Sequence, residues 1–348
     1  MNFFKTLVLS FLTILLTACN GGNSDLAKKV ELYLNEGKTS FQQGDTVFIA
    51  LKKQKNTSID SLVYFLNGQK IAIQQDRWIL DSVPLGIQKL EVKLYSDGKE
   101  GILRKSITVL SNTPPEVYTI RVLNEFPHDI SAYTQGLEFE NDTLYEGTGR
   151  YGQSYLRKLD FETGKVLNEV ALNESYFGEG ISIMNNTIYQ LTWQNGVGFM
   201  YDLDTMKKTG TFNYDKSKQG WGLCNDGQNL YKSDGTEKIW ILNPQTLQEE
   251  GYIQITSHAK VYTKVNELEF ANGKIYANSY QNDGIMIIDP KTGALLGVVD
   301  GRSLKERVLQ HKEIDVLNGI AYHPGRKTFF LTGKNWNKLF EVEFLKKD

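Results

Sequence analysis

Cysteine and histidine are scarce in this sequence of 348 residues, and each scarcity excludes a class of site. The two cysteines are Cys19 and Cys224. Because Cys19 is predicted to carry lipid, Cys224 has no disulfide partner, and we expect it to pack in the core. The four histidines are His128, His258, His311 and His323. None has the short paired spacing of zinc sites, so we predict no metal site and no metal-dependent hydrolysis.

An excess of charge of either sign is also lacking. Lysine and arginine together number 39, aspartate and glutamate 41, and the formal net charge is -2. The basic residues are scattered, without the stripe that phosphate binding needs, so no nucleic-acid partner is expected. The Gly-x-Ser-x-Gly elbow, the phosphate-binding loop and the dinucleotide fingerprint are missing as well. Serine-hydrolase and nucleotide chemistry are therefore not indicated.

Long hydrophobic runs are missing after the first twenty residues. Residues 1–19 combine Lys5, an apolar run over residues 7–16 and small residues that lead into Cys19. The run is too short to span a bilayer comfortably, and the stretch LTAC, which ends at Cys19, resembles the lipobox of bacterial lipoproteins. We predict a lipoprotein signal peptide with lipobox over residues 1–19 and lipidation at Cys19. The alternative is a plain cleavable signal peptide that happens to contain a cysteine.

This N-terminus predicts where the protein works. We expect an exported lipoprotein of the cell envelope, in the periplasm or at the outer membrane surface, that touches the membrane only through its lipid anchor. Residues 20–29 are predicted to be a tether, because they open with the flexible composition NGGNSD.

Apolar residues alternate with polar ones from residue 30 to residue 111, in stretches such as DTVFIALKK and QKLEVKLYSDG. Such alternation is typical of half-buried β-strands. The dipeptides Asn67-Gly68 and Asp97-Gly98 are strong hairpin turns between strands. We predict a small immunoglobulin-like β-sandwich over residues 30–111, followed by a domain boundary at the two prolines of SNTPPE.

A short turn motif recurs through the rest of the chain. Its copies are DFETG (160–164), DLDTM (202–206), NPQTL (243–247) and DPKTG (289–293), roughly 45 residues apart. Each copy lies between two apolar strands, so its residues are interpreted as hairpin formers and not as catalytic acids.

A second motif recurs out of phase with the first. Five copies of roughly 45 residues, each worth four strands, predict a five-bladed β-propeller over residues 117–346 and an all-β chain. The fifth copy lacks its last strand, and residues 117–126 have the strand character needed to close the ring. Two separate sandwiches, the alternative, would leave the period unexplained. The copies are QGL (135–137), EGI (179–181), WGL (221–223), NEL (266–268) and NGI (318–320).

The lead residues of the second motif are expected to converge on the propeller axis. Equivalent residues of all blades meet at one face, so these five should ring the mouth of the channel, with the following glycines as clearance. They are Gln135, Glu179, Trp221, Asn266 and Asn318. The next strands add Trp193, Tyr280, Lys334 and Trp336. Aromatic walls with convergent amides, one acid and one base suit a small polar ligand.

Glu179, in the stretch YFGEGI, is the one carboxylate among the five lead residues. Behind Phe177 and near two tryptophans, its pKa should be raised by desolvation, the direction that an acid-base catalyst working near neutrality requires. The alternative roles are ordinary ones: a turn carboxylate for Glu179, a solvated turn lysine for Lys334, and core aromatics, as we expect for Trp240.

Nine stretches, in order, resemble one known family. They are YTQGLEF (133–139), YFGEGI (176–181), LTWQNG (191–196), GWGL (220–223), SDGT (233–236), NELEF (266–270), YANSYQND (276–283), LNGIAYHP (317–324) and TGKNW (332–336). Residues 117–346 thereby resemble the plant-type glutaminyl-peptide cyclotransferases, also called glutamine cyclotransferases, which are five-bladed propellers with bacterial members. The sandwich lies outside the resemblance.

The resemblance implies an enzyme that converts an N-terminal glutaminyl residue of a peptide or protein to pyroglutamate and releases ammonia. It implies that Glu179 is the catalytic glutamate. The pocket positions that it implies are Gln135, Trp193, Trp221, Asn266 and Lys334. One departure concerns the aromatic wall, where Tyr276 and Tyr280 stand at positions that hold tryptophans in the family.

A concrete mechanism follows as a hypothesis, in which Glu179 carries a proton from the attacking amine to the leaving nitrogen. The predicted catalytic residues are Glu179, Lys334 and Asn266, and Lys334, Asn266 and Gln135 are expected to hold the carbonyl oxygen. The predicted substrate-binding residues are Gln135, Phe177, Trp193, Trp221, Tyr280, Asn318 and Trp336. This mechanism requires no metal and no organic cofactor, although a propeller channel can hold a structural cation. We expect the protein to be a monomer. The alternative is a non-catalytic, surface-tethered propeller that binds a small ligand or protein partner.

Overall fold

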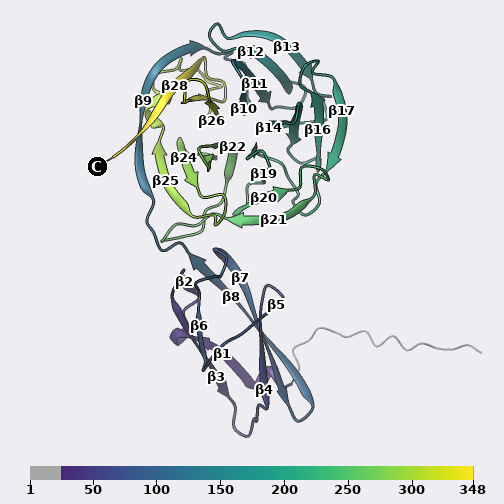
Figure 1. Cartoon of the computed structure of the whole chain (residues 1–348), viewed down its shortest axis with the longest axis vertical. Coiled ribbons are helices and arrows are strands. Elements are labelled where there is room, and N and C mark those ends of the chain that lie inside the picture. Colours follow the sequence, from purple (N-terminus) through teal and green to yellow (C-terminus); the bar gives the residue numbers. More distant parts are fainter. Residues whose placement is uncertain (1–24, 348) are drawn as a thin grey trace, which may run out of the picture.

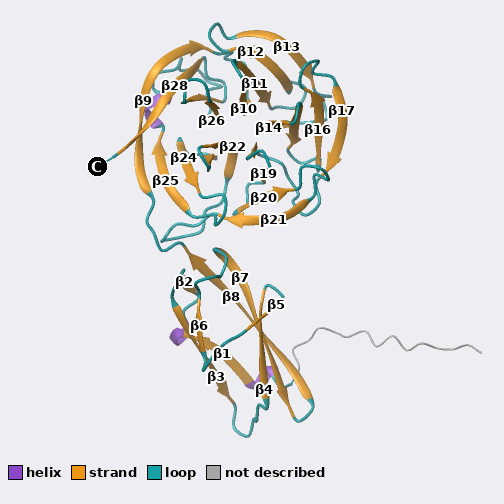
Figure 2. Ribbon diagram, viewed as in Figure 1, coloured by secondary structure: helices purple, strands orange, loops and turns teal. Residues whose placement is uncertain are grey.

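Residues 25–347 are described in the computed structural model, and they fold into two β-structured parts (Figures 1 and 2). The first part is a sandwich of two sheets, which begins with 3-10 turns at Ala27–Lys29 and Asn35–Gly37. One sheet has the order β1 (Val30–Leu34), β3 (Thr46–Lys53), β6 (Arg77–Ile79). The other has the order β2 (Ser40–Gln42), β8 (Lys99–Leu110), β7 (Gly86–Ser96), β4 (Ser61–Leu66), β5 (Gln69–Ile71).

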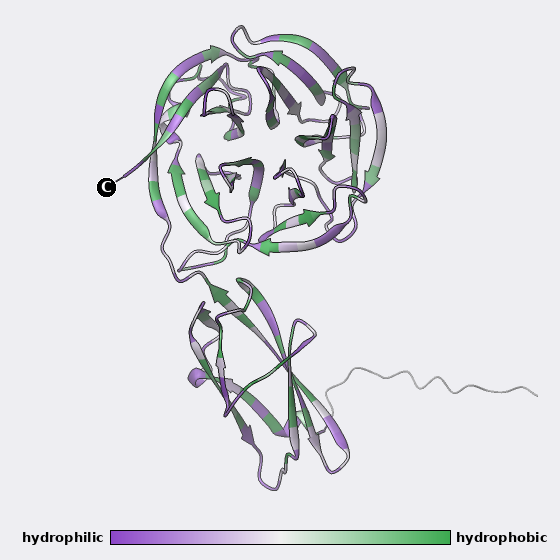
Figure 3. Cartoon of the chain, in the orientation of Figure 1, coloured by the Kyte–Doolittle hydropathy of each residue, from purple (hydrophilic) through white to green (hydrophobic). Residues whose placement is uncertain are grey.

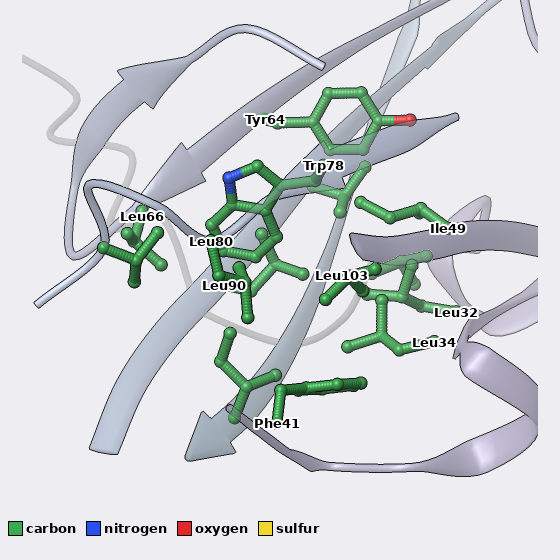
Figure 4. Packing of buried hydrophobic residues seen from close by; sticks show 14 of the residues in the cluster. Leu32, Leu34, Phe41, Ile49, Tyr64, Leu66, Trp78, Leu80, Leu90 and Leu103 are labelled. Carbon is green, nitrogen blue, oxygen red and sulfur yellow. The ribbon is translucent and has the colours of Figure 1, made fainter. Parts of the chain in front are cut away.

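The alternation in the sequence explains how these strands pack. Every second side chain of β7 is buried, as the period of a half-buried strand requires. The buried faces of the two sheets enclose a core that includes Trp78 and Leu90 (Figure 4). The predicted hairpin turns at 67–68 and 97–98 take positive φ between β4 and β5 and between β7 and β8. This is the conformation that a two-residue turn needs, so both predictions are confirmed.

The N-terminal edge of the sandwich differs from the prediction. Leu26 and Ala27 are only 8% and 4% exposed and pack in the sandwich core, so the predicted tether over residues 20–29 does not extend to its expected end. Composition does not show that two apolar residues find a core beside them. The predicted signal peptide, its lipobox and Cys19 lie outside the described residues. Within residues 25–347, no helix has the length and apolar character to cross a membrane.

The second part is the predicted propeller, whose five blades follow one another around an axis (Figure 1). Blade 1 consists of β10 (Thr134–Glu140), β11 (Thr143–Thr148), β12 (Tyr155–Asp160) and β13 (Lys165–Ala171). Blade 2 consists of β14 (Gly178–Met184), β15 (Thr187–Thr192), β16 (Val197–Asp202) and β17 (Lys208–Asn213). Blade 3 consists of β18 (Leu223–Asn225), β19 (Leu230–Ser233), β20 (Lys238–Leu242) and β21 (Glu249–Gln254). Blade 4 consists of β22 (Val265–Ala271), β23 (Lys274–Ser279), β24 (Gly284–Ile288) and β25 (Leu295–Asp300).

Blade 5 combines strands from both ends of the propeller. It consists of β26 (Leu317–His323), β27 (Thr328–Gly333), β28 (Lys338–Lys346) and β9 (Glu116–Pro127), and it follows the short helix α1 (Arg302–Lys305). β9 runs antiparallel to β28 and so closes the ring, as predicted. Its first residues also pair in parallel with β25. Blades 4 and 5 therefore form one eight-stranded sheet, a link that the sequence did not predict.

The first repeated motif forms the outer hairpin of blades 1 to 4, as predicted. In blade 1 the Gly164 N–H donates to the Asp160 carbonyl at 2.8 Å, and the Thr163 N–H donates to Asp160 Oδ1 at 3.2 Å. In blade 4 the Gly293 N–H donates to the Asp289 carbonyl at 2.9 Å. These acids satisfy backbone donors in turns and are not part of a site.

The glycines after the lead residues provide clearance where the innermost strands approach one another. A Cβ atom on Gly222 would lie 2.1 Å from the Asn266 carbonyl oxygen. One on Gly180 would lie 2.7 Å from the Trp221 carbonyl oxygen. Both obstacles are backbone atoms that cannot rotate away, so these positions require glycine.

The sandwich lies beside the ring and does not cover its channel (Figure 1). Gln254, at the end of β21, joins the two parts: the Ile87 N–H donates to its Oε1 at 2.9 Å, and its Nε2 donates to the Ile87 carbonyl at 3.1 Å. The Ser111 N–H donates to Thr256 Oγ1 at 3.2 Å. Apolar and polar residues alternate along the strands of both parts (Figure 3). Cys224 and Trp240 are buried in the propeller, as expected.

Candidate active site

Near its start, each of three innermost strands turns a side chain toward the axis at one end of the channel. Gln135, Glu179 and Asn266 are the second residues of β10, β14 and β22. Strand pairing shifts register across these positions, for example over residues 134–136 in β10 and 178–181 in β14. Such irregularities remove a residue from the ladder and re-aim its side chain. The lead residues of several blades therefore converge, as the repeat predicted.

A cavity of about 220 Å³ lies at this end of the channel. It is smaller than the roughly 300–1,000 Å³ of drug-sized pockets and suits one amino-acid residue. Its lining residues are Tyr133, Gln135, Phe177, Glu179, Trp193, Trp221, Asn266, Tyr280 and Lys334. A larger hollow of about 480 Å³ lies between the sandwich and β21, but among residues 25–347 its lining has a single charged side chain, Lys291.

Glu179 is the buried acid of the cavity, with 4% of its surface exposed. Burial raises the pKa of its carboxyl group well above the usual range, against the opposing effects of the Lys334 charge and a hydrogen bond from Gln135. Its Oε2 is buried and has no hydrogen-bond partner within residues 25–347. A buried acceptor without a partner is costly, so this oxygen is available to a ligand.

Lys334 is the buried base, with 2% of its surface exposed. Burial lowers the pKa of its amino group, while the charges of Glu179 and Asp315 raise it. Its Nζ lies 4.7 Å from the ring centroid of Tyr133 and 5.4 Å from that of Tyr280, where cation–π attraction favours the charged form. Burial thus shifts the acid and the base toward each other in pKa, as is typical of reactive sites.

Comparison with known proteins agrees with this geometry. Residues 101–344 match the glutamine cyclotransferase family. A glutaminyl-peptide cyclotransferase of Arabidopsis thaliana is 41% identical over 227 residues, which are 64% of this chain and 71% of the relative. The crystal structure of Myxococcus xanthus glutaminyl cyclase superposes with a TM-score of 0.63 at 35% identity, over 67% of this chain and 100% of that chain.

The chain belongs to the glutamine cyclotransferase family. The resemblance seen in the sequence is thereby confirmed, as is the all-β fold of a sandwich followed by a propeller.

One buried side chain, Asn318, orients two amides of the cavity. Its Nδ2 donates to the Thr134 carbonyl at 2.9 Å and to Gln135 Oε1 at 3.3 Å. Its Oδ1 therefore faces Asn266, whose Nδ2 donates to it at 2.8 Å. Because the Thr134 carbonyl can only accept, it determines which way all three amides point. The Gln135 amide nitrogen is left to bond Glu179.

Half-buried aromatic rings form the walls of the cavity. Phe177 meets Trp193 edge to face at a centroid distance of 5.6 Å, and Trp221 meets Tyr280 at 5.4 Å. Tyr133 meets Phe177 at 6.2 Å. Edge-to-face pairs favour one relative orientation of the rings, so these contacts help to define the walls beside Glu179.

Two predicted substrate-binding residues do not line the cavity. Asn318 is fully buried behind Gln135 and Asn266, so it acts through them. Trp336 is also fully buried, and its Nε1 donates to the Asp315 carbonyl at 3.0 Å. The repeat predicts where a backbone lies, but not how deep its side chain is. The structure places the other eight predicted residues, including Phe177 and Tyr280, in the wall.

Several residues of the site were not predicted. Tyr133 lines the cavity, and its hydroxyl donates to Asp315 at 3.0 Å. Its place two residues before Gln135, at the entry to β10, could have indicated it. Gln219 accepts hydrogen bonds from two of the wall indoles, and it lies two residues before Trp221. Tyr276, one of the two tyrosines at positions that depart from the family, packs in the core against Phe329, so only Tyr280 of these two lines the cavity within residues 25–347.

The channel behind the cavity holds further buried acids. Glu267 accepts from the Leu137 N–H at 3.3 Å and the Ile320 N–H at 2.9 Å, and burial raises the pKa of Glu267 well above the usual range. No group of three or more His, Cys, Asp or Glu side chains within the described part of the chain is arranged to hold a metal ion. A structural cation in the channel stays a prediction.

Replacement of Asn318 by aspartate should destabilise the fold, although this residue touches no cavity surface. In Asn318→Asp, oxygens would face the Thr134 carbonyl and Gln135 Oε1, so two acceptors lose their donor in a buried site. We expect a loss of about 2 kcal/mol or more in the free energy of unfolding, measured by urea denaturation. The control is Asn185→Asp, an exposed turn residue, which should change the free energy by less than about 0.5 kcal/mol. Equal stability of the two variants would contradict the proposed amide orientation.

Proposed function

We propose that the chain converts the N-terminal glutaminyl residue of a peptide or protein to pyroglutamate and releases ammonia, without a metal. The names of its relatives support this activity. The observation that carries the chemistry is the buried Oε2 of Glu179, which has no partner within residues 25–347 and lies in the wall of a cavity of one-residue size.

In the proposed reaction, the α-amine nitrogen of the substrate attacks the side-chain amide carbon and forms the five-membered ring. The bond from that carbon to the amide nitrogen then breaks, and ammonia leaves. The amine must lose one proton and the leaving nitrogen must gain one, so one carboxyl group can transfer the same proton. Glu179 Oε2 fits this role because it has no partner within residues 25–347 and because a carboxyl group with a raised pKa holds a proton more readily and can still return it.

The polar groups of the cavity divide the remaining work. Lys334 is the cation available to the oxygen that gains negative charge, and Asn266 can add its second amide N–H. This assignment differs from the sequence-based hypothesis for Gln135. Its amide is held by Asn318 and directed at Glu179, so Gln135 positions the carboxyl group and does not hold the substrate oxygen.

The aromatic walls act on the shape of the substrate. A glutaminyl side chain has several rotatable bonds, and only folded conformations bring its amine to its amide. Rigid rings on both sides can hold it in such a conformation, which is the main requirement of an intramolecular reaction. A propeller that only binds a partner needs no unpaired buried carboxylate beside a buried lysine, so this alternative is less well supported.

Glu179→Gln should abolish most of the activity. The amide keeps the size of the side chain but cannot carry the proton, so we expect kcat to fall by about 100-fold or more. The measurement is ammonia release from a Gln-initiated dipeptide, with unfolding by heat as the check on the fold. Glu174→Gln, an exposed acid on the preceding loop, is the control and should keep its rate. An unchanged rate in Glu179→Gln would refute the role of Glu179. Inactivity of the unmodified protein on several Gln-initiated peptides would favour the binding-only alternative.

Lys334→Met should move the pH dependence of kcat/KM. The rate needs ionised Glu179 and falls as pH drops through its raised pKa. The Lys334 charge lowers that pKa, so its removal should shift the acid limb to higher pH. The substrate amine titrates equally in both assays. The difference between the two pH profiles therefore reports the change in the pKa of Glu179. Lys264→Met, an exposed lysine, should leave the limb in place. An unshifted limb in Lys334→Met would show that the two groups are not coupled.

We also propose that the protein is an exported lipoprotein of the cell envelope, anchored through Cys19. The lipobox-like end of the apolar N-terminal stretch supports this proposal. Labelled palmitate fed to expressing cells should enter the protein, and Cys19→Ser should lose both the label and the association with membranes. Equal labelling of the Cys19→Ser variant would overturn the proposal.

A further inference from the structure

Two indoles of the cavity wall share one acceptor that the proposed mechanism does not use. Trp193 Nε1 and Trp221 Nε1 each donate to Gln219 Oε1 at 2.8 Å. Trp193 follows β15 of blade 2, and Trp221 precedes β18 of blade 3. One carbonyl oxygen therefore links the walls contributed by two neighbouring blades. Both indole N–H groups donate to Gln219, so a ligand in the cavity would contact the ring carbons of the two indoles and not their N–H groups.

The segment that carries Gln219 is held at its start by a buried ion pair. The Lys216 and Ser217 N–H groups donate to Glu249 Oε2 at 2.6 and 2.8 Å. Glu249 Oε1 lies 2.7 Å from Lys232 Nζ, and both side chains are almost fully buried. Lys232 Nζ also lies 3.7 Å from the ring centroid of Tyr214. This pair lies outside the cavity lining, and its bonds hold the backbone just before Gln219.

The other end of the segment is tied to both walls. The Gly220 N–H donates to the Trp193 carbonyl at 3.1 Å, and the Trp221 N–H donates to the Ser233 carbonyl at 3.0 Å. The Tyr214 hydroxyl accepts from the Thr192 N–H at 2.8 Å and donates to the Thr192 carbonyl at 2.9 Å. Gln219 thus lies on a short segment that is held by hydrogen bonds at both ends. These bonds fix the backbone position from which its side chain accepts the two indole N–H groups.

We propose that Gln219 is a positioning residue that sets the orientation of Trp193 and Trp221, and thereby the fraction of bound glutaminyl side chains that are folded for ring closure. This inference rests on the proposed function. Free to rotate, either indole would widen the cavity and admit extended conformers of the substrate. If extended conformers replace folded ones and bind about as tightly, total binding is kept while less of the bound substrate can react. The expected signature of a loosened wall is therefore a lower kcat at a similar KM.

The decisive comparison uses two substitutions at the same position. Gln219→Leu keeps the size of the side chain but removes the acceptor. We expect its kcat for a Gln-initiated dipeptide to fall about 10-fold while KM changes by less than about 2-fold. Gln219→Glu keeps an oxygen that both indoles can use. Assayed on its own pH plateau, it should recover kcat to within about 2-fold of the unmodified enzyme. The matched control is Gln228→Leu, an exposed turn residue, which should match the unmodified enzyme.

A structural readout separates this inference from the proposed function. In ¹H–¹⁵N spectra, the indole N–H signals of Trp193 and Trp221 should move and exchange faster with solvent in Gln219→Leu, and should recover in Gln219→Glu. Unchanged indole signals, or a Gln219→Leu variant with normal kcat, would overturn the positioning role. So would a fall in stability alone with kcat preserved. An unmodified protein without activity would refute the proposed function and the catalytic part of this inference, whereas normal activity with an unaffected Gln219→Leu would refute the inference alone.

Discussion

Five innermost strands converge on one axis, and the crowding that results determines both the fold and the site. At Gly222 and Gly180 a single added carbon would meet the backbone of the next strand. Register shifts in the pairing turn Gln135, Glu179 and Asn266 inward. Side chains from blades far apart in the sequence therefore meet in a cavity of about 220 Å³. Closure of the ring by β9 keeps this arrangement intact.

Two buried acid–base pairs in the same propeller differ in the pKa of their carboxyl groups. Glu249 has bonds to Lys232, Ser217 and the backbone, and these hold the pKa of its carboxyl group below the usual range despite burial. Glu179 is buried more deeply, one of its oxygens has no partner within residues 25–347, and its pKa is raised. Deeper burial and fewer donors together distinguish it from Glu249. The first pair holds a segment of backbone, whereas proton exchange is the role that we propose for the second.

The sequence alone predicted much of this architecture, because a sequence repeat shows which stretches have equivalent backbone positions in successive blades. The turn motif near Asp160 and its three relatives have the predicted hairpin role, and Gln135, Glu179 and Asn266 meet at the axis as their shared phase required. The same phase also brings Asn318 to the ring, where it bonds Asn266 and Gln135, but it does not show that this side chain lies behind the cavity lining. Trp336 is not part of the repeated motif, and it packs in the core after β27. Gln219 lies in an irregular segment between blades, where no period exists, and its role depends on two rings that only folding brings together. The parallel contact of β9 with β25 was also not predicted, since a parallel partner has no local signal in the sequence.

The most direct test of the account is where the product binds. A crystal structure with a bound pyroglutamyl dipeptide should place the ring between the aromatic walls, with its lactam nitrogen within about 3 Å of Glu179 Oε2. The ring oxygen should point toward Lys334. A ring bound in the same cavity with its nitrogen turned away from Glu179, or a product bound outside the cavity, would contradict the central claim that this carboxyl oxygen receives the proton of the attacking amine.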